Sequence, residues 1–335
     1  MPTDDPTSTS TSTVADEGLH PAGDDPDWQE SAYLAWRDPR SGLGGNHRIG
    51  NEPNRGTANL WCGLYHQDGT RFLRNGEGLD QVLLDDAVAD VFGVGAGPQR
   101  IFHDGSQLRF VLDGDGCRAD LVLTDEGERS FANAKTFSGP SGVTGTIFSN
   151  NFHVACRVSG TVELDGRRAE LVDAPAWRDH SWGVRRWDSF VSSRSFGGSH
   201  GVGDDALHFR FASMVGSNGS FFRIGALTRC GEKIPVANAS MLVHVDDDSM
   251  SCPSAEVRYE LEGGGTTVVR IATIGGMIGV TAQRHGWESV GDVTVDGVPG
   301  GWGFLETTLN ARNGSARPGF VLGEAMTNGI VRPPS

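Results

Sequence analysis

The stretch WRDHSWGVRRW, residues 177–187, holds three of the eight tryptophans and three arginines, and it places Asp179 and His180 next to Ser181. Successive side chains of an extended strand point to opposite faces, so Asp179 and His180 should diverge. The stretch therefore predicts a strand with an acid on one face and His180 beside Trp182 on the other. The simpler alternative is a buried corner in which Asp179 only orients His180 or caps a loop.

On both sides of this stretch, short apolar runs alternate with tight-turn signals. Asp-Gly pairs occur at Asp68-Gly69, Asp113-Gly114 and Asp165-Gly166, and such pairs between alternating runs are a strong hairpin signal. Short strands at this regular spacing are typical of antiparallel sandwiches and barrels, so we expect an all-β protein. Residues 79–92 (LDQVLLDDAVADVF) fit either a helical stripe or a strand.

The pattern of strands and turns predicts a tail and two β domains. Residues 1–27 are rich in Ser, Thr and acid and poor in apolar residues, so they are expected to form a disordered acidic tail. Residues 28–173 should form an N-terminal β domain. Residues 174–335 should form a C-terminal β domain that carries the Asp-His-Ser-Trp-Gly motif.

Composition and charge argue against several classes of partner. The formal net charge is −15, and beyond residue 30 the chain still has 35 acids against 28 basic residues, which makes nucleic acid an unsuitable partner. The five cysteines are widely spaced without a CxxC pair, which fits neither a disulfide framework nor a zinc ribbon. The sequence has no run of 18 apolar residues and no leader pattern, so we expect a soluble cytoplasmic protein without a membrane span.

Other motifs in the chain carry weaker signals. Ser199 lies in a G-x-S-x-G match, but a β-like run follows where a nucleophile elbow needs a helix, so a serine hydrolase is a minor alternative. The glycines of 93–98 lack the strand–turn–helix context of a dinucleotide loop. The ten histidines show no H-E-x-x-H or H-x-H spacing, and no metal or other cofactor is predicted.

At the level of motifs, the chain resembles the lipocalin-like superfamily of carotenoid 1,2-hydratases and AttH-type proteins. The specific element is the Asp-His-x-Trp-Gly core of residues 179–183. Glu30-Ser31-x-Tyr33, the run 48–54 and the glycine-aromatic stretch 300–306 look like one branch of that superfamily, so the resemblance covers most of residues 29–310.

The resemblance implies two lipocalin-like β-barrel domains around a cavity for a hydrophobic ligand. Members of the superfamily hydrate, isomerise or cyclise lipophilic molecules, often without a cofactor. The chain departs from the carotenoid hydratases at residues 207–211, where no Tyr or carboxylic acid is present. Asp179, His180 and Glu306 are therefore the predicted catalytic residues, and His180 is expected to face the cavity because it shares a face with Trp182.

The leading hypothesis is an acid–base enzyme acting on a terpenoid, steroid or polyketide-like small molecule. A desolvated carboxyl keeps its proton, and indole faces stabilise developing carbocations. The reaction would be hydration or dehydration, double-bond isomerisation or cyclisation, and the rival class is a non-catalytic carrier of a hydrophobic ligand. The chain is also compatible with a homodimer. The predicted substrate-binding residues are Trp182, Trp61, Trp177, Arg185, His208 and Trp302.

Overall fold

The computed structural model describes residues 18–333 except 82–92, 104–106, 133–134, 139–143, 148, 186–189, 248–250, 281–284 and 310–327. The described chain is almost entirely β-structure, and its only helical elements are the 3-10 turns Pro53–Arg55 and Gly203–Asp205. The predicted all-β class is confirmed. Of the ambiguous segment 79–92, residues 79 and 80 end a strand, and residues 82–92 lie outside the described residues.

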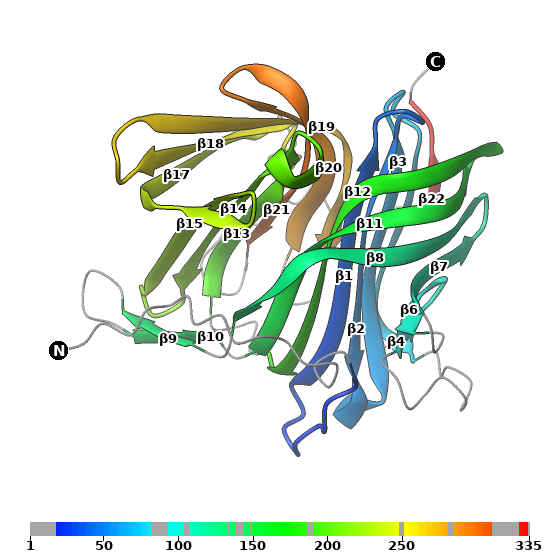
Figure 1. Ribbon diagram of the computed structural model, residues 1–335. Coiled ribbons are helices and arrows are strands. Elements are labelled where there is room, and N and C mark those ends of the chain that lie inside the picture. The colour runs from blue at the N-terminus through cyan, green and yellow to red at the C-terminus, as the bar shows by residue number, and fades with distance from the viewer. Residues whose placement is uncertain are drawn as a thin grey trace.

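The first sheet has eleven strands in the order β22-β4-β3-β2-β1-β12-β11-β8-β7-β6-β5 (Figure 1). All its neighbouring strands pair antiparallel. An isolated bridge from Gln81 to Ala96 brings the end of β4 to β5, so the sheet curls back on itself. The strands are β1 (Trp28–Asp38), β2 (Leu43–Glu52), β3 (Thr57–His66), β4 (Arg71–Asp80), β5 (Gly93–Ala96), β6 (Gln99–His103), β7 (Leu108–Gly114), β8 (Cys117–Ala132), β11 (Ser149–Leu164), β12 (Arg167–Val184) and β22 (Gly329–Val331).

The second sheet has nine strands in the order β16-β15-β14-β13-β21-β20-β19-β18-β17. Its neighbouring strands also pair antiparallel. A small hairpin of β9 (Lys135–Ser138) and β10 (Thr144–Ile147) stands apart from both sheets. The strands are β13 (Phe190–His200), β14 (Leu207–Gly216), β15 (Phe221–Arg229), β16 (Glu232–Ile234), β17 (Val236–His244), β18 (Ser254–Leu261), β19 (Thr266–Val280), β20 (His285–Val295) and β21 (Val298–Leu309).

The Asp-Gly turn at residues 165–166 lies where the sequence predicts it, whereas Asp113 and Gly114 are the paired end of β7 and the turn follows them at residues 115–116. At Asp165-Gly166, both residues have positive φ angles, 52° and 77°, and they join β11 to β12 with Leu164 opposite Arg167. Two positive φ angles match the twist that a two-residue hairpin needs, and Asp and Gly tolerate them. This turn starts β12, the strand that carries Asp179 and His180.

Three apolar clusters hold the fold together. One lies within the first sheet and includes Leu34, Trp36 and Leu64, and a second lies within the second sheet around Phe209 and Tyr259. The third joins the two sheets through residues of β1, β3 and β4 on one side and of β19, β20 and β21 on the other. In Figure 1 the two sheets accordingly lie side by side. The members of the third cluster are Tyr33, Ala35, Trp61, Tyr65, Leu73, Met277, Val290, Trp302 and Phe304.

The division of the chain differs from the predicted one. The predicted boundary between residues 173 and 174 falls within β12, which pairs with β1 and β11 and ends at Val184. The Asp-His-Ser-Trp-Gly motif therefore lies in the first sheet. The short β22 also returns to this sheet and pairs with β4. Both differences have one cause, which is that strand pairing connects segments far apart in the sequence.

The prediction that residues 1–27 form a disordered tail also differs in part from the structure. Residues 1–17 lie outside the described residues, but 18–27 contact the first sheet. The Nδ2 atom of Asn54 donates to the carbonyl oxygen of Asp25 at 2.7 Å, and the Nε atom of Arg55 donates to that of Pro26 at 2.9 Å. His20 stacks on Trp182 with 3.8 Å between ring centroids. The ordered chain therefore begins before Trp28.

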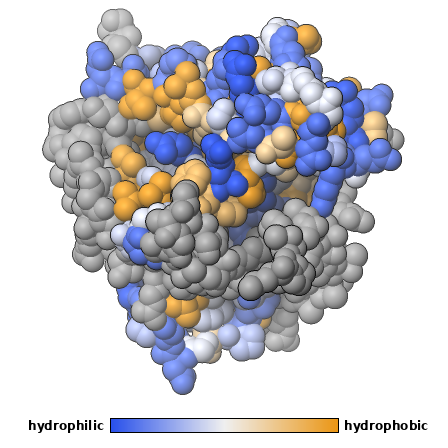
Figure 2. Space-filling view, turned by 90° about the vertical axis from the view of Figure 1, so that its left-hand side faces the viewer, coloured by the Kyte–Doolittle hydropathy of each residue, from blue (hydrophilic) through white to orange (hydrophobic). Residues whose placement is uncertain are grey.

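The surface of the second sheet carries both hydrophobic and hydrophilic side chains. The side of the molecule that carries this sheet shows hydrophobic residues in separate groups between hydrophilic ones (Figure 2). Exposed large hydrophobic residues on strands of the second sheet include Phe221 and Leu242. Among the described residues, no helix is long and apolar enough to cross a membrane. A homodimer stays a prediction.

Candidate functional site

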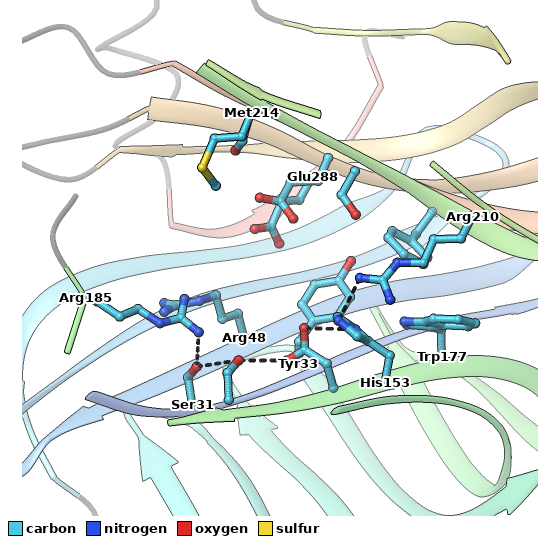
Figure 3. Close-up of a pocket in the computed structure, with 15 residues that line it drawn as sticks. Ser31, Tyr33, Arg48, His153, Trp177, Arg185, Arg210, Met214 and Glu288 are labelled. Carbon is cyan, nitrogen blue, oxygen red and sulfur yellow. Dashed lines mark hydrogen bonds and ion pairs between the residues drawn. The ribbon is translucent and has the colours of Figure 1, made fainter. Parts of the chain in front are cut away.

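A cavity of about 180 Å³ lies between the two sheets, beside the apolar cluster that joins them. The first sheet contributes its lower wall in the view of Figure 3, and the second sheet contributes Glu288 and Met214 from above. The lining is strongly polar, with three arginines and three carboxylic acids. Its residues are Ser31, Tyr33, Arg48, His153, Trp177, Asp179, Ser181, Arg185, Ser193, Ser195, Arg210, Met214, Glu288, Phe304 and Glu306.

A row of polar contacts runs along the wall formed by β1 and β12. The Nη2 atom of Arg185 donates to Ser31 Oγ at 3.2 Å, and Ser31 Oγ lies 3.5 Å from Ser181 Oγ. Ser181 Oγ in turn donates to Asp179 Oδ1 at 3.4 Å. Because Ser31 and Ser181 are paired across β1 and β12, the register of these strands sets the row. The row links the arginine to Asp179.

His153 on β11 completes the wall beside Asp179. The Nη2 atom of Arg210 donates to His153 Nε2 at 2.7 Å, and a guanidinium group can only donate. In the neutral imidazole the proton is therefore on Nδ1, which lies 3.7 Å from Asp179 Oδ2. Burial and the charge of Arg210 hold the pKa of His153 well below its usual value, so the ring is neutral at physiological pH.

The cavity shifts the ionisation of its own groups. Burial raises the pKa of Asp179 to about 6, Glu306 adds to this effect, and the three arginines oppose it. Burial lowers the pKa of Arg185 and that of Arg210 to about 10. The pKa of Tyr33 is raised well above its usual value by burial and by the nearby carboxylates, so its phenol keeps its proton. Asp179 thus titrates near neutrality, whereas Arg185 and Arg210 stay charged and Tyr33 stays neutral.

Two further acids face the cavity from the second sheet. Glu288 on β20 is buried and accepts a hydrogen bond from Asn46 Nδ2 at 3.0 Å, and Asn46 also accepts one from the Tyr65 hydroxyl. Glu306 on β21 accepts a hydrogen bond from Thr308 Oγ1 at 3.2 Å. The acids therefore come from opposite walls, Asp179 from one sheet and Glu306 from the other. Such an arrangement can exchange protons with both sides of one small molecule.

A sequence profile described as Domain of unknown function (DUF7064) matches residues 13–311. The chain belongs to the DUF7064 family. The match includes both sheets except β22, and it includes every residue that lines the cavity. No curated protein matches the DUF7064 chain in sequence.

Solved structures share the fold of the DUF7064 chain. An AttH-type protein from Nitrosomonas europaea has a TM-score of 0.59 at 15% identity, covering 90% of this chain and 98% of its own. CghA, solved with Sch210972, has a TM-score of 0.53 at 12% identity and covers 85% and 89%. Kievitone hydratase from Nectria haematococca has a TM-score of 0.53 at 10% identity and covers 91% and 94%. The lipocalin-like fold predicted from the motif is thus confirmed.

Four of the nine predicted site residues line the cavity of the DUF7064 chain, namely Asp179, Glu306, Trp177 and Arg185. They come from β12, the segment that follows it, and β21. Asp179 keeps 22% side-chain exposure, in keeping with its place on the cavity wall. The cavity lining does not include the other five, which are His180, Trp182, Trp61, His208 and Trp302.

The predicted orientation of His180 is wrong. His180 lies on the face of β12 opposite Asp179, is only 1% exposed, and its Nε2 lies 2.6 Å from Glu30 Oε1. Trp182 shares that face and stacks on His20. The strand alternation predicted that the pair would diverge, but the cavity lies on the side of Asp179. His180 is held by Glu30.

The other three predicted residues also lie outside the cavity lining. Trp61 and Trp302 belong to the apolar cluster between the sheets. The Trp302 Nε1 atom donates to Ser199 Oγ at 3.0 Å, and Ser199 lies within β13 with no α-helix after it among the described residues. His208 lies on β14, two residues before Arg210, but outside the lining. The geometry therefore gives no support to a serine nucleophile.

Sequence reasoning missed several lining residues. Tyr33 and Arg48 lie in the motif pieces that support the family resemblance, so their place in those pieces was a usable signal. Arg210 lies in the strand 207–211, where the family resemblance predicts a Tyr or an acid and gives no signal for a basic residue. His153 and Glu288 had no local signal, because only strand pairing brings them to the site.

Proposed function

We propose that this protein is an acid–base enzyme that adds water to, or removes water from, a hydrophobic small molecule. The observation that carries the proposal is the placement of the Asp179 carboxyl in a polar cavity between the two sheets, beside a His153 whose tautomer is set by Arg210. The shared fold with kievitone hydratase supports the reaction class. In the proposed mechanism, side chains of this protein carry out every step.

In the proposed reaction Asp179 is the proton donor. A carboxyl group whose pKa is near the working pH is an efficient general acid, because it holds a proton and releases it readily. In hydration, Asp179 protonates the alkene carbon, and Glu306 on the opposite wall takes a proton from the attacking water. In dehydration the two carboxyls exchange roles: Glu306 protonates the departing hydroxyl, and Asp179 takes the proton from the substrate carbon.

The fixed charges of the cavity serve the transition state. His153 Nδ1–H points to Asp179 and stabilises its carboxylate once the proton has left. Arg48, Arg185 and Arg210 stabilise negative charge that develops on a carbonyl oxygen conjugated to the reacting bond. These groups are held in place before the substrate arrives, which is the arrangement that gives electrostatic catalysis its strength. If no water enters the cavity, the same groups can catalyse the migration of a double bond in the substrate.

The apolar part of the lining supports a hydrophobic substrate. Trp177, Phe304 and Met214 lie on the cavity wall, and Trp177 packs 6.0 Å from the Phe304 ring. Aromatic faces beside a polar centre bind the hydrocarbon part of a ligand and leave the polar groups to orient it. A terpenoid, steroid or polyketide-like molecule with a hydroxyl or double bond next to a carbonyl meets these requirements.

Asp179→Asn tests the proposal. The amide keeps the shape of the side chain but cannot donate the proton, so turnover should fall by about 10²-fold or more. The protein is incubated with a panel of hydrophobic enones and their hydrated forms, and the extracts are analysed by mass spectrometry for gain or loss of one water. Asp120→Asn, whose side chain is 52% exposed on β8, is the matched control and should keep full activity.

Two outcomes contradict the proposal. If Asp179→Asn turns over the substrate as fast as wild type, Asp179 is not the proton donor. If the wild-type protein binds members of the panel tightly but returns them unchanged, the chain is a carrier for those compounds.

A further inference from the structure

A second cluster of ionisable side chains lies on the face of β12 opposite the cavity. His180 Nε2 lies 2.6 Å from Glu30 Oε1, and His20 Nδ1 lies 2.9 Å from the same oxygen. All three atoms lie within 4.8 Å of one another. His180 and Glu30 are buried, with 1% and 3% side-chain exposure, and His20 keeps 19%. Two imidazoles and one carboxylate thus converge on a single point.

The atoms that converge are those that divalent transition metals prefer. Imidazole nitrogen and carboxylate oxygen bind Zn²⁺ at roughly 2.0–2.2 Å, and two histidines with one carboxylate are a recurring ligand set. Tetrahedral bonds of that length place neighbouring ligand atoms about 3.3 Å apart. Compared with the contacts of 2.9 and 2.6 Å, each side chain would move by less than about 1 Å.

The surroundings of the three side chains hold them in this arrangement. The backbone N–H of His20 donates to the other carboxylate oxygen, Glu30 Oε2, at 3.0 Å, which leaves Oε1 directed at the two rings. Trp182 stacks on His20 with an interplanar angle of 3°, and Phe152 meets the His180 ring edge-on. Outer contacts of this kind fix ligand orientation and limit the access of water.

The charge of the cluster also fits a cation. In the described chain, the hydrogen bonds to the Glu30 carboxylate come from His20 and His180, and none comes from a lysine or arginine. A buried carboxylate is costly unless a positive charge lies close to it. A divalent cation bound to Oε1 and to both ring nitrogens supplies that charge.

We propose that His20, Glu30 and His180 form a binding site for a divalent transition metal, with Zn²⁺ as the best-fitting ion. The ion joins the segment 18–27 to β1 and β12, so its role is structural. The site is separate from the cavity, because Asp179 and His180 point to opposite faces of β12. The proposal therefore does not depend on the proposed catalytic activity.

Metal titration tests the site directly. The full chain is stripped with a chelator and titrated with Zn²⁺ by calorimetry, and retained metal is measured after dialysis. We expect one Zn²⁺ per chain in wild type and at least a 100-fold loss of affinity in His20→Ala. His200→Ala on β13 and Cys230→Ser at the exposed cysteine are the controls, and both should bind as wild type does.

A second measurement separates loss of metal from loss of fold. His20 is partly exposed and lies outside the strands, so His20→Ala should fold as wild type does. Limited proteolysis should then show that Zn²⁺ protects the segment 18–27 in wild type and gives no protection in His20→Ala. Glu30→Gln should give the same result if it folds. The proposal is overturned if wild type retains no Zn²⁺, or if His20→Ala binds it with unchanged affinity.

Discussion

Asp179 and His180 are adjacent in the sequence but belong to two different sites. The two faces of β12 contact different parts of the molecule. The second sheet lies on the side of Asp179, and the segment 18–27 lies on the side of His180. Alternation in a strand forces the two side chains apart. A substitution at one position therefore tests one site alone, and this makes the proton-transfer and metal-binding proposals separable by experiment.

At the residue scale, His47 should make the stability of the protein depend on pH. His47 is fully buried, accepts a hydrogen bond from Trp36 Nε1 at 3.1 Å, and burial lowers its pKa to about 3. The unfolded chain takes up a proton near pH 6.5, so it binds more protons than the folded chain below that pH. Stability should therefore fall as the pH drops, by about 1.4 kcal/mol between pH 7.5 and 5.5 from this residue alone.

Urea unfolding of wild type and His47→Gln at the two pH values measures this contribution. The variant lacks the titrating ring, so its loss of stability between pH 7.5 and 5.5 should be smaller by about 1.4 kcal/mol. Trp36→Phe is the matched control, because it removes the hydrogen bond and keeps the imidazole. Equal losses in wild type and His47→Gln would show that His47 does not stay neutral.

The sequence predicts less about individual site residues than about strands. The Asp-His-x-Trp-Gly core singled out β12, which lines the cavity, and alternation predicted that Asp179 and His180 diverge. The face that the cavity occupies was predicted wrongly, because both faces of β12 carry polar and aromatic residues and the pattern does not distinguish them. His153 and Arg210 come from strands that meet only after folding, so no local pattern links them to Asp179.

At the element scale, turns were predictable and sheet membership was not. A hairpin is a local structure, so Asp165-Gly166 was enough to predict the connection of β11 and β12. The pairing of β12 with β1 joins residues about 150 positions apart, such as Ser31 and Ser181. No local signal specifies that pairing, which is why the motif was assigned to the second domain.

Glycines on β19 let the two sheets approach each other, and Gly279 is a test of that contact. A Cβ atom at Gly279 would lie 2.4 Å from the Trp61 ring, which belongs to the cluster between the sheets. Gly279→Ala should therefore lower the free energy of unfolding by about 1–3 kcal/mol through overpacking. Gly263→Ala is the control, because a Cβ there meets nothing within 4 Å. Chemical denaturation measures both, and equal stabilities would mean that the sheets are not packed at Gly279.

At the scale of the whole molecule, the site is a product of two sheets. The first sheet supplies Asp179 and His153, and the second supplies Arg210 and Glu306. Each half alone has an apolar core of its own, but neither encloses the cavity. The polar lining lies beside the apolar cluster that joins the halves, so substitutions in that cluster should change activity as well as stability.

The segment before β1 gives the last prediction, and it concerns the stability of the whole fold. Removing residues 1–17 should leave the melting temperature unchanged, because a stretch so rich in Ser, Thr and acid buries too little apolar surface to add stability. Removing residues 1–27 also takes away the His20 hydrogen bonds to Glu30 and the stack on Trp182, and it removes the partners of Asn54 and Arg55. A buried carboxylate that loses part of its hydrogen bonding destabilises the folded state. The melting temperature should then fall by several degrees, because each kcal/mol corresponds to roughly 2–4 °C in a domain of about 150–250 residues. Calorimetry of both truncations in a buffer with chelator measures the effect without a contribution from metal. Equal melting temperatures for the two truncations would show that the segment 18–27 adds nothing to stability.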